Sequence, residues 1–343
     1  MPPPETGRLE TGRFDTGRFA TGLVAGKFSP LHKGHQLVID AASSACRRVV
    51  LLSWSSPEFA RCEAPRRERW LRALYSSAEI HVLTQDLPDN AAPDLEHRLF
   101  VARFCARELG EPPDAVFTSE TYGPGFAAEL SRSFGREVVH VPVDPGRTRI
   151  PISGSALRAD PHANRRFLPD LVYADFVETV CFLGAESTGK STISAALARA
   201  PGTTFVEEYG RTLWEEKGGQ LEFEDLLAIA RTHLAHEDEQ RLRAHRFLFV
   251  DTSPLTTLFY CLAQFGRADA RLEELAGHAY DHVYLCMPDC PLVQDGTRSG
   301  EDFRGAQHAW YLAELAKRGI AYTPLEGTLE TRVAAVERAL GLR

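Results

Sequence analysis

Long apolar runs are missing from the sequence: none approaches the roughly 20 residues that a membrane-spanning helix needs. The first ten residues, MPPPETGRLE, also lack the basic-then-apolar order of a secretion signal. Cysteine is sparse, and its seven copies form no CxxC pair, which disfavours a disulfide framework and a zinc site. We interpret the closest two, Cys286 and Cys290, as buried or loop thiols. Together these absences predict a cytoplasmic protein with no membrane partner.

Positive charge is also in short supply. The 39 lysines and arginines face 47 aspartates and glutamates, which gives a net charge of −8. An acidic chain is a poor default binder of nucleic acid, so any anionic ligand must be held by local charge. With 343 residues the chain is too long for one ordinary hydrophobic core, and we expect two domains.

Residues 6–22 repeat a short polar unit of the type TGRFD, with a glycine in every copy. Because so short a repeat cannot bury a face, we predict a flexible tail over residues 1–21. After it, strands and helices alternate in two series, which predicts an α/β fold of two doubly wound parallel-sheet domains. We expect the first domain over 22–168, beginning with a strand at 23–28, and the second over 177–343.

The stretch GKFSPLHKGH, residues 26–35, lies between a predicted strand and a predicted helix. In that position the amides at the start of the helix face an anion. Gly26 and Gly34 allow a close backbone approach, and His32 and His35 add ring N–H donors. The stretch therefore predicts a phosphate cradle; two ordinary surface histidines are the alternative.

A second cradle is predicted at GAESTGKS, residues 184–191, which also follows a strand and precedes a helix. The pattern GxxxxGKS in this context indicates a P-loop. Gly184 and Gly189 let amides wrap the phosphates, Lys190 spans the β and γ positions, and Ser191 ligates Mg²⁺.

Two further stretches follow strands in the second half. RFLFVD ends in Asp251, which we predict to bind the same metal, with a cap of the next helix as the alternative. VEEYGR, residues 206–211, follows another short strand. There Glu208 is a candidate acceptor for the proton of a hydroxyl substrate and Arg211 a candidate phosphate contact. A solvated helix start is the alternative for this segment.

QDGTRSGEDFR, residues 294–304, is rich in glycine and carries two arginines. A mobile lid of this composition would bring Arg298 and Arg304 to a transferred phosphoryl group. A plain surface loop with exposed arginines is the alternative.

The order of these motifs resembles one known family. GKFSPLHKGH fits GxFxPxHxGH, the HxGH signature of nucleotidyltransferases, and ISGSALR at 152–158 matches their ISxTxxR with Ser155 in place of threonine. Alone, ISGSALR would be an ordinary capped helix start. The P-loop follows, and further short pieces stand in order: PRRERWL, TSE, VDPGRT, EYGR, VDTSPLTT and DGTRS. The chain therefore resembles the bifunctional NMN adenylyltransferase and ribosylnicotinamide kinase family (NadR).

The resemblance implies two linked reactions. At the second domain nicotinamide riboside and ATP give NMN, with Mg²⁺ as the metal. At the first domain the ionised phosphate of NMN attacks the α-phosphorus of ATP, which gives NAD and pyrophosphate. Such a nucleophile needs no general base, so catalysis reduces to positioning and charge stabilisation.

The motifs and the resemblance together assign site residues of four kinds. Catalytic roles are expected for Lys27, His32, His35, Arg158, Lys190, Glu208 and Asp251. ATP contacts are expected at Gly26, Phe28, Gly34, Ser153, Ser155, Gly184, Glu186, Ser187, Thr188, Gly189, Ser191, Thr192, Arg298 and Arg304. Substrate contacts are expected at Trp54, Arg67, Glu207, Tyr209 and Arg211. Metal ligation is expected for Ser191 and Asp251.

Two departures from the family matter. Its enterobacterial members begin with a helix-turn-helix domain, whereas only some 22 residues precede the first predicted strand, so we expect no DNA binding. Val206 and Glu207 stand where the family has an aromatic residue that stacks on nicotinamide, which leaves the nucleoside of the kinase open. The alternatives are a phosphopantetheine or FMN adenylyltransferase fused to a general nucleoside kinase, and a non-catalytic nucleotide sensor. A homo-oligomer is also left open.

Overall fold

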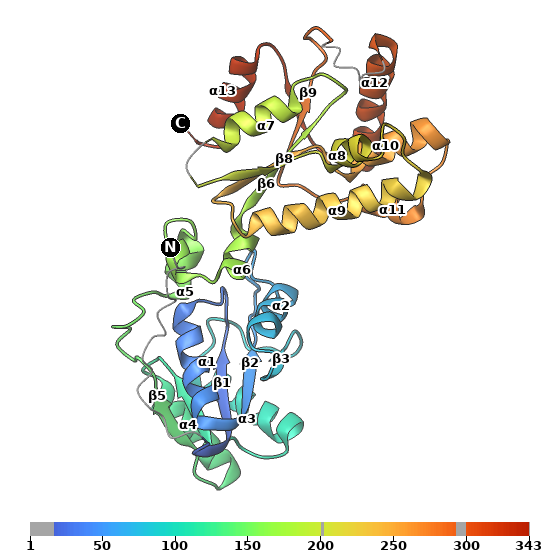
Figure 1. Cartoon of the computed structure of the whole chain (residues 1–343). Helices are drawn as coiled ribbons and strands as arrows, with labels where there is room; N and C mark the ends of the chain where they lie inside the picture. The colour runs from blue at the N-terminus through green and yellow to red at the C-terminus, as the bar shows by residue number, and fades with distance from the viewer. Residues whose placement is uncertain (1–16, 200–201, 293–299, 343) are drawn as a thin grey trace, which may run out of the picture. The chain divides into compact units, whose positions relative to one another are not determined.

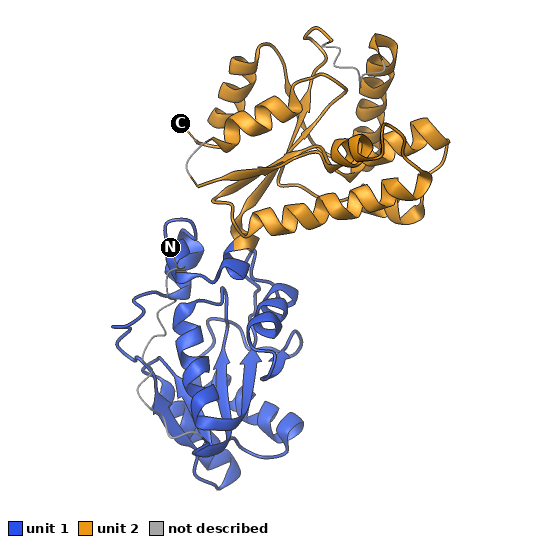
Figure 2. Ribbon diagram, viewed as in Figure 1, with its two compact units in different colours: residues 1–173 blue, residues 174–343 orange. Residues whose placement is uncertain are grey.

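The computed structural model describes residues 17–199, 202–292 and 300–342. By its internal contacts the chain divides into two compact units, Met1–Tyr173 and Ala174–Arg343 (Figure 2). Within the described ranges, none of the helices combines the length and the apolar character that a membrane crossing requires. Each unit is built on its own five-stranded parallel sheet, so the predicted fold class is confirmed.

The sheet of the first unit has the strand order β3-β2-β1-β4-β5. Its strands are β1 (Phe19–Gly26), β2 (Cys46–Ser53), β3 (Glu79–Val82), β4 (Ala115–Thr118) and β5 (Val139–Pro142). Its helices are α1 (Lys33–Ala45), α2 (Ala64–Leu74), α3 (Asp94–Phe104), α4 (Gly123–Phe134), α5 (Gly154–Ala159) and α6 (Asp170–Tyr173), with single turns at Cys105–Leu109 and Arg165–Phe167. The single turn Ala174–Phe176 begins the second unit. The central strands are apolar on both faces because helices cover both sides. Alternate residues such as Leu23 and Val50 pack under α3 and α4, and α1 lies along β1, β2 and β4 (Figure 1).

The strand β1 begins at Phe19, four residues before the predicted start, so the end of the glycine-containing repeat belongs to the sheet. Phe19 pairs with Cys46 of β2 and packs edge-on against Phe117. Gly22 is required by close packing, because a Cβ there would lie 2.4 Å from the Cys46 sulfur. Residues 1–16, which carry most of the predicted tail, lie outside the described residues.

The sheet of the second unit has the order β10-β9-β6-β8-β7. Its strands are β6 (Glu178–Leu183), β7 (Thr204–Val206), β8 (Phe247–Asp251), β9 (His282–Cys286) and β10 (Thr323–Leu325). Its helices are α7 (Lys190–Ala198), α8 (Tyr209–Glu216), α9 (Phe223–Arg241), α10 (Pro254–Phe265), α11 (Ala270–Leu275), α12 (Glu301–Arg318) and α13 (Leu329–Ala339). Figure 1 shows α7 and α13 on one face, and the residues of α9, α10, α11 and α12 form a separate core on the other.

In both sheets the first strand of the unit is central, and its two neighbours are reached by crossovers in opposite directions. These neighbours are β2 and β4 beside β1, and β8 and β9 beside β6. A crevice opens at the carboxyl ends of the strands at such a reversal, and ligands of open α/β sheets bind there. The turns after β1 and β6 carry the two motifs that the sequence singled out, so each unit places one motif at its reversal point.

Candidate active sites

The histidine turn of the first unit is held by reciprocal hydrogen bonds at the start of α1. His32 is the residue that caps the helix, and its Nδ1 accepts the Gly34 N–H at 3.1 Å. His35 reaches back, and its Nδ1 accepts the His32 N–H at 3.3 Å. Since an Nδ1 that accepts a hydrogen bond is unprotonated, these bonds assign the proton of each neutral ring to Nε2. Both rings therefore offer Nε2–H as a donor.

The two imidazoles stack with ring centroids 3.7 Å apart, and Phe28 packs edge-on against His35 at 4.9 Å. Burial lowers the pKa of His32 to about 4, with a further contribution from the positive charge of Arg147. Burial likewise lowers the pKa of His35 well below its usual value, as do His32 and Arg147. The pair is therefore neutral at neutral pH, and the positive charge that an anion needs must come from other side chains.

Lys27 and Arg158 supply such charge. Arg158 extends from α5 to the histidine turn, where its Nη1 donates to the Ser29 carbonyl at 2.5 Å and its guanidinium lies 3.9 Å over the Phe59 ring. Burial and the charge of Arg158 lower the pKa of Lys27, whose Nζ donates to the Asn90 carbonyl at 3.2 Å. The motif ISGSALR is thus brought to the motif HKGH across 129 residues of sequence.

The alternative interpretation of ISGSALR also holds in part. The Ser153 hydroxyl caps α5 by accepting the Ala156 N–H at 3.2 Å. Ser155 is exposed one turn from Arg158, and its hydroxyl accepts a hydrogen bond from the guanidinium at 3.2 Å. Gly154 leaves room for that arginine, since a Cβ would lie 3.1 Å from its Nη1. The helix start is therefore a cap and also the support of Arg158.

Two cavities flank the end of β1. The smaller, of about 80 Å³, is lined by His32, Gly34 and His35 together with Glu120 and Arg147. The larger, of about 210 Å³, is lined by residues of β1 and of the segments beyond β2, β3 and β4, among them Gly26, Lys27, Trp54, Asn90, His97 and Tyr122. The sequence predicted Trp54 as a substrate contact but assigned no role to Arg147, although the quoted piece VDPGRT contains it.

Arg67 is not at either cavity, and its predicted substrate contact is wrong. The side chain is fully buried. Its guanidinium donates to the Ser53 hydroxyl at 3.0 Å, to the Cys62 carbonyl at 2.9 Å and to Glu58. Arg67 therefore ties the end of β2 to the loop that follows it. Phe28 is also buried, and its ring packs against His35.

The P-loop of the second unit joins β6 to α7. Gly184 has φ 142°, and a Cβ there would lie 2.7 Å from the Cys286 carbonyl oxygen, so no side chain fits. Gly189 also has a positive φ, of 83°, and Lys190 starts the helix with its Nζ 3.0 Å from the Ala185 carbonyl. Successive turns of this kind direct backbone N–H groups into one concavity, where they bind anions.

The other predicted residues of the loop divide into two groups. Ser191 and Thr192 are exposed on the first turn of α7, and Ser187 is half-buried with φ 56°. Thr188 is buried, and its hydroxyl donates to the Ala185 carbonyl at 2.8 Å, which braces the loop from within. Thr188 is therefore a structural residue through its side chain.

Arg332 of α13 supports the P-loop from behind. Its buried guanidinium donates to the Thr188 carbonyl at 2.8 Å, to the Met287 carbonyl at 3.0 Å and to the Gly327 carbonyl at 2.9 Å, and it also contacts Asp289. The outward carbonyl of the loop is thereby fixed by a residue 144 positions away. No local pattern marked this arginine.

Asp251 lies at the end of β8 and is buried beside the P-loop. Burial and the charge of Glu208 raise its pKa to about 6, against the opposite effects of Lys190 and the Ser191 hydroxyl. Within the described part of the chain its Oδ1 has no hydrogen-bond partner. The alternative role as a helix cap is wrong, because the Ser253 hydroxyl caps α10 by accepting the Leu255 N–H at 3.2 Å.

These features fit a divalent cation. A buried carboxylate oxygen without a partner is costly unless a cation or a donor satisfies it. Among the described residues no cluster of three His, Cys, Asp or Glu side chains could hold a metal ion. Mg²⁺ commonly uses one or two protein ligands and takes the rest from water and phosphate oxygens, and Asp251 and Ser191 could supply the protein ligands here.

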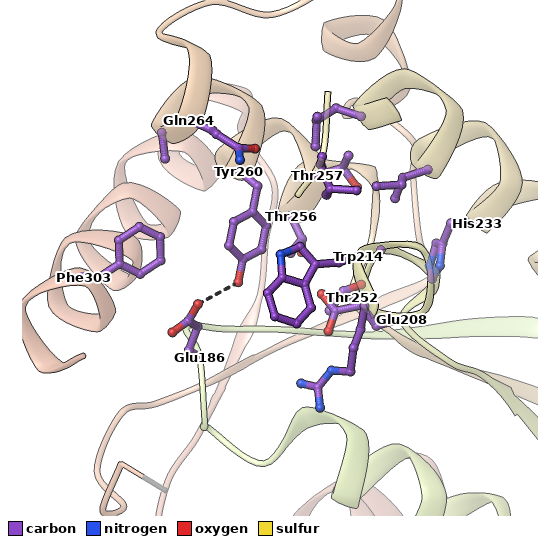
Figure 3. Close-up of a pocket in the computed structure, with 16 residues that line it drawn as sticks. Glu186, Glu208, Trp214, His233, Thr252, Thr256, Thr257, Tyr260, Gln264 and Phe303 are labelled. Atoms are coloured by element: carbon purple, nitrogen blue, oxygen red, sulfur yellow. Dashed lines mark hydrogen bonds between the residues drawn. The ribbon is translucent and has the colours of Figure 1, made fainter. Parts of the chain in front are cut away.

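A cavity of about 380 Å³ opens beside this site. It is lined by residues of the P-loop, α8, α9, α10 and α12, including Glu186, Glu208, Arg211, Trp214, His233, Thr252, Tyr260 and Phe303 (Figure 3). The Glu186 carboxylate faces the cavity and accepts the Tyr260 hydroxyl at 3.2 Å. Carboxylates and aromatic rings thus share one pocket, which suits a flat cationic ring.

Several predicted contacts of the second unit are not at this cavity. Glu207 is exposed, and Tyr209 packs edge-on against His236 of α9, so neither lines the pocket, whereas Glu208 and Arg211 do. Glu186 does not present its amide to phosphate, because that N–H donates to Gln307 at 2.8 Å. Glu207 and Tyr209 are therefore not among the residues that line the 380 Å³ cavity, whereas Glu186 lines it through its carboxylate.

The part of the predicted lid that the structure describes is the start of a helix and is not a loop. Residues 301–304 form the first turn of α12, and Arg304 is buried there with its Nη2 donating to the Cys290 carbonyl at 2.8 Å. Arg304 is therefore held in the interior and is not an exposed arginine of a loop. Arg298 and the rest of the proposed lid lie outside the described residues. Cys286 is buried in β9 and Cys290 is half-buried in the loop after it, in line with their interpretation as buried or loop thiols.

The chain is similar to known proteins along most of its length. A family profile described as an AAA domain matches residues 179–332. The "Trifunctional NAD biosynthesis/regulator protein NadR" of Escherichia coli (strain K12) is 32% identical over an alignment of 298 residues that covers 81% of this chain and 71% of the relative. Its counterpart of the same name in Salmonella typhimurium (strain LT2) is 30% identical over 296 residues, with the same coverage.

Two solved structures share the fold over almost the whole chain. A crystal structure of a NadR protein in complex with NR covers 97% of this chain and 98% of its own, with a TM-score of 0.71 and 21% identity. A second, of a NadR protein in complex with NAD and AMP-PNP, covers 96% and 98% with the same TM-score and identity. Both units are therefore shared as folds.

Proposed function

The chain belongs to the NadR family of NAD biosynthesis, and from that premise we propose that it carries out two consecutive reactions. The second unit phosphorylates nicotinamide riboside with ATP to give NMN. The first unit joins NMN to the AMP part of ATP, which gives NAD and releases pyrophosphate. The observation that carries the proposal is that each unit places a glycine-containing strand–turn–helix motif at its reversal point, with a cavity of about 380 or 210 Å³ beside it.

In the second unit the riboside occupies the 380 Å³ cavity. Its pyridinium ring is a flat cation, and the Trp214 and Tyr260 rings together with Glu186 and Glu208 favour such a group. Trp214 would take the place of the aromatic residue that is missing before EYGR. It comes from the next turn of α8, and its ring lies in the middle of the pocket (Figure 3).

Phosphoryl transfer then needs a base, cations and a fixed geometry. The riboside hydroxyl attacks the γ-phosphorus, its proton passes to Glu208, and ADP leaves. Lys190 and Arg211 stabilise charge on the phosphate oxygens. Asp251 and Ser191 would hold Mg²⁺, which when bound neutralises charge on the β- and γ-phosphates.

In the first unit ATP binds over the histidine turn and NMN in the 210 Å³ cavity against Trp54. The NMN phosphate attacks the α-phosphorus, and the bond from that phosphorus to the bridging oxygen of pyrophosphate breaks. His32 and His35 donate neutral Nε2–H groups to phosphate oxygens, while Lys27 and Arg158 supply positive charge. No proton has to be removed from the nucleophile, which agrees with a site whose histidines are kept neutral.

Mass spectrometry of the full chain with nicotinamide riboside, ATP and Mg²⁺ tests the proposal. NMN should appear first and NAD second. His35→Ala should still make NMN but little NAD, and Lys190→Ala should make NAD from added NMN but no NMN from the riboside. Each variant thus serves as the folding control of the other. Phosphorylation of a different nucleoside in preference to the riboside, or NAD formation that survives His35→Ala unchanged, would overturn the corresponding half.

A further inference from the structure

Arg147 projects from a turn that is rigidly built. The turn follows β5, and the Asp144 carboxylate accepts the N–H groups of Thr148 at 2.8 Å and of Arg149 and Ile150 at 3.1 Å, as well as the Thr148 hydroxyl at 3.0 Å. Asp144 and Arg147 both have φ of 50°, in the left-handed region that favours glycine. A turn that keeps an arginine in this conformation must hold it by other contacts, and the Asp144 bonds supply them.

The guanidinium of Arg147 lines the same small cavity as His32 and His35. Its Nη2 donates to Glu120 Oε1 at 2.5 Å, and Glu120, from the loop after β4, lines the same cavity. The two side chains are 39% and 37% exposed. Ion pairs at this exposure are weakly stabilising and exchange readily with solvent ions, so the contact can open without disturbing the fold.

The cavity lacks positive charge of its own apart from this arginine. The two histidines are neutral, as their low pKa values show, and the positive charge of Arg147 contributes to that neutrality. A polyphosphate that enters the cavity therefore meets two neutral imidazoles, one guanidinium and the carboxylates of Glu120 and Asp144. The Asp144 carboxylate is already held by hydrogen bonds from four donors within its own turn, so Glu120 is the carboxylate that competes for the guanidinium. A guanidinium binds phosphate oxygens through two parallel N–H bonds. A polyphosphate carries several negative charges, so we expect it to displace the single, half-exposed Glu120 carboxylate from Arg147.

We propose that Arg147 is a further catalytic residue of the first unit, a cationic ligand of the ATP polyphosphate chain, and that Glu120 holds it over the cavity until the anion displaces the carboxylate. The inference rests on the proposed transferase function of this unit. It gives Glu120 and Arg147 opposite effects on ATP binding: the arginine strengthens it, and the carboxylate competes with it.

The test compares Arg147→Gln with Arg149→Gln, which removes the same charge from an exposed position of the same turn. In NAD formation from NMN and ATP, Arg147→Gln should raise the KM for ATP about tenfold or more, in line with a lost charged hydrogen bond, while Arg149→Gln stays within about twofold. Glu120→Gln should lower the KM for ATP, and the double variant Glu120→Gln/Arg147→Gln should match Arg147→Gln alone. NMN formation by the other unit reports that each variant is folded.

Equal effects of the two arginine variants would overturn the inference, as would a raised KM for ATP in Glu120→Gln. If the unaltered chain makes no NAD, the proposed function fails and the inference is decided separately by calorimetric titration with pyrophosphate. That titration uses the Lys190→Ala background, which weakens the P-loop of the other unit. Arg147→Gln should then weaken pyrophosphate binding about tenfold and Glu120→Gln should strengthen it; unchanged binding in both would refute the assignment.

Discussion

Replacing Gly34 by alanine tests whether the histidine turn works because its rings are fixed. A Cβ at this position would lie 2.9 Å from His32 Cε1 and 3.0 Å from its Nδ1. Ordinary contacts begin at 3.4 Å, so the His32 ring must retreat by about 0.5 Å. The ring cannot retreat freely, because it is buried and stacks on His35.

The expected loss follows from those contacts. A shift of this size lengthens the 3.1 Å bond from the Gly34 N–H to Nδ1, and the loss of such a cap costs about 1 kcal/mol of stability. It also moves both Nε2–H donors away from the phosphates. Misplacement on the order of 1 Å can cost about 10²-fold in rate, so for a shift of about half that size we expect NAD formation to fall about tenfold with only modest loss of stability.

The assay measures NAD formation from NMN and ATP, NMN formation from the riboside, and thermal unfolding on the same samples. Gly146→Ala is the matched control, because its Cβ would make only an ordinary 3.5 Å contact with Thr148. It should keep both activities, and Gly34→Ala should keep NMN formation alone. If Gly34→Ala forms NAD at the unaltered rate, the rings either tolerate the displacement or do not touch the reacting phosphates, and the reasoning is refuted.

Three further substitutions probe the second unit. Gly184→Ala should abolish NMN formation while leaving NAD formation from NMN, because its Cβ would meet the backbone oxygen of Cys286 at 2.7 Å; normal NMN formation would show that the loop can shift. Asp251→Asn should lower the rate of NMN formation at least 10²-fold and raise the Mg²⁺ concentration that the reaction needs. It should not lower stability, because it removes a buried carboxylate whose pKa is raised. An unchanged Mg²⁺ dependence would count against the metal role. Burial raises the pKa of Glu237 from 4.5 to about 7, so between these values the folded state holds a proton that the unfolded state has released, and stability falls as pH rises through that window. Glu237→Gln should therefore be more stable than the unaltered chain by about 3 kcal/mol at pH 8 but not at pH 4, as measured by urea unfolding, and an equal difference at both pH values would contradict this account.

The fold was predictable because each unit begins with an apolar strand followed at once by a motif that requires a strand before it and a helix after it. The start of β1 was not. Its glycine-containing residues resemble a linker when the sequence is considered alone. Gly22 lies in the sheet, where the Cys46 side chain leaves no room for a Cβ and only glycine fits. That constraint comes from a residue distant in sequence, which local composition does not record.

The geometry of the candidate sites was predictable where backbone conformation decides it, as in the histidine turn and the P-loop. It was not predictable where the direction of a side chain decides. Arg67 and Arg304 are turned into the interior, although arginines in short polar motifs suggest phosphate contacts. The rings around the 380 Å³ cavity come from three helices, so no spacing in the sequence connects Trp214, Tyr260 and Phe303.

The hold of Arg332 on the Thr188 carbonyl bears on how the chain is synthesised. Domains fold as units while the ribosome extends the chain from its N-terminus. The sheet of the first unit is complete once β5 has been synthesised. The P-loop of the second unit, in contrast, gains its support only when Arg332 is made, 144 residues after Thr188. If synthesis stopped before α13, the first unit could fold completely, whereas the P-loop of the second unit would lack the arginine that holds its Thr188 carbonyl.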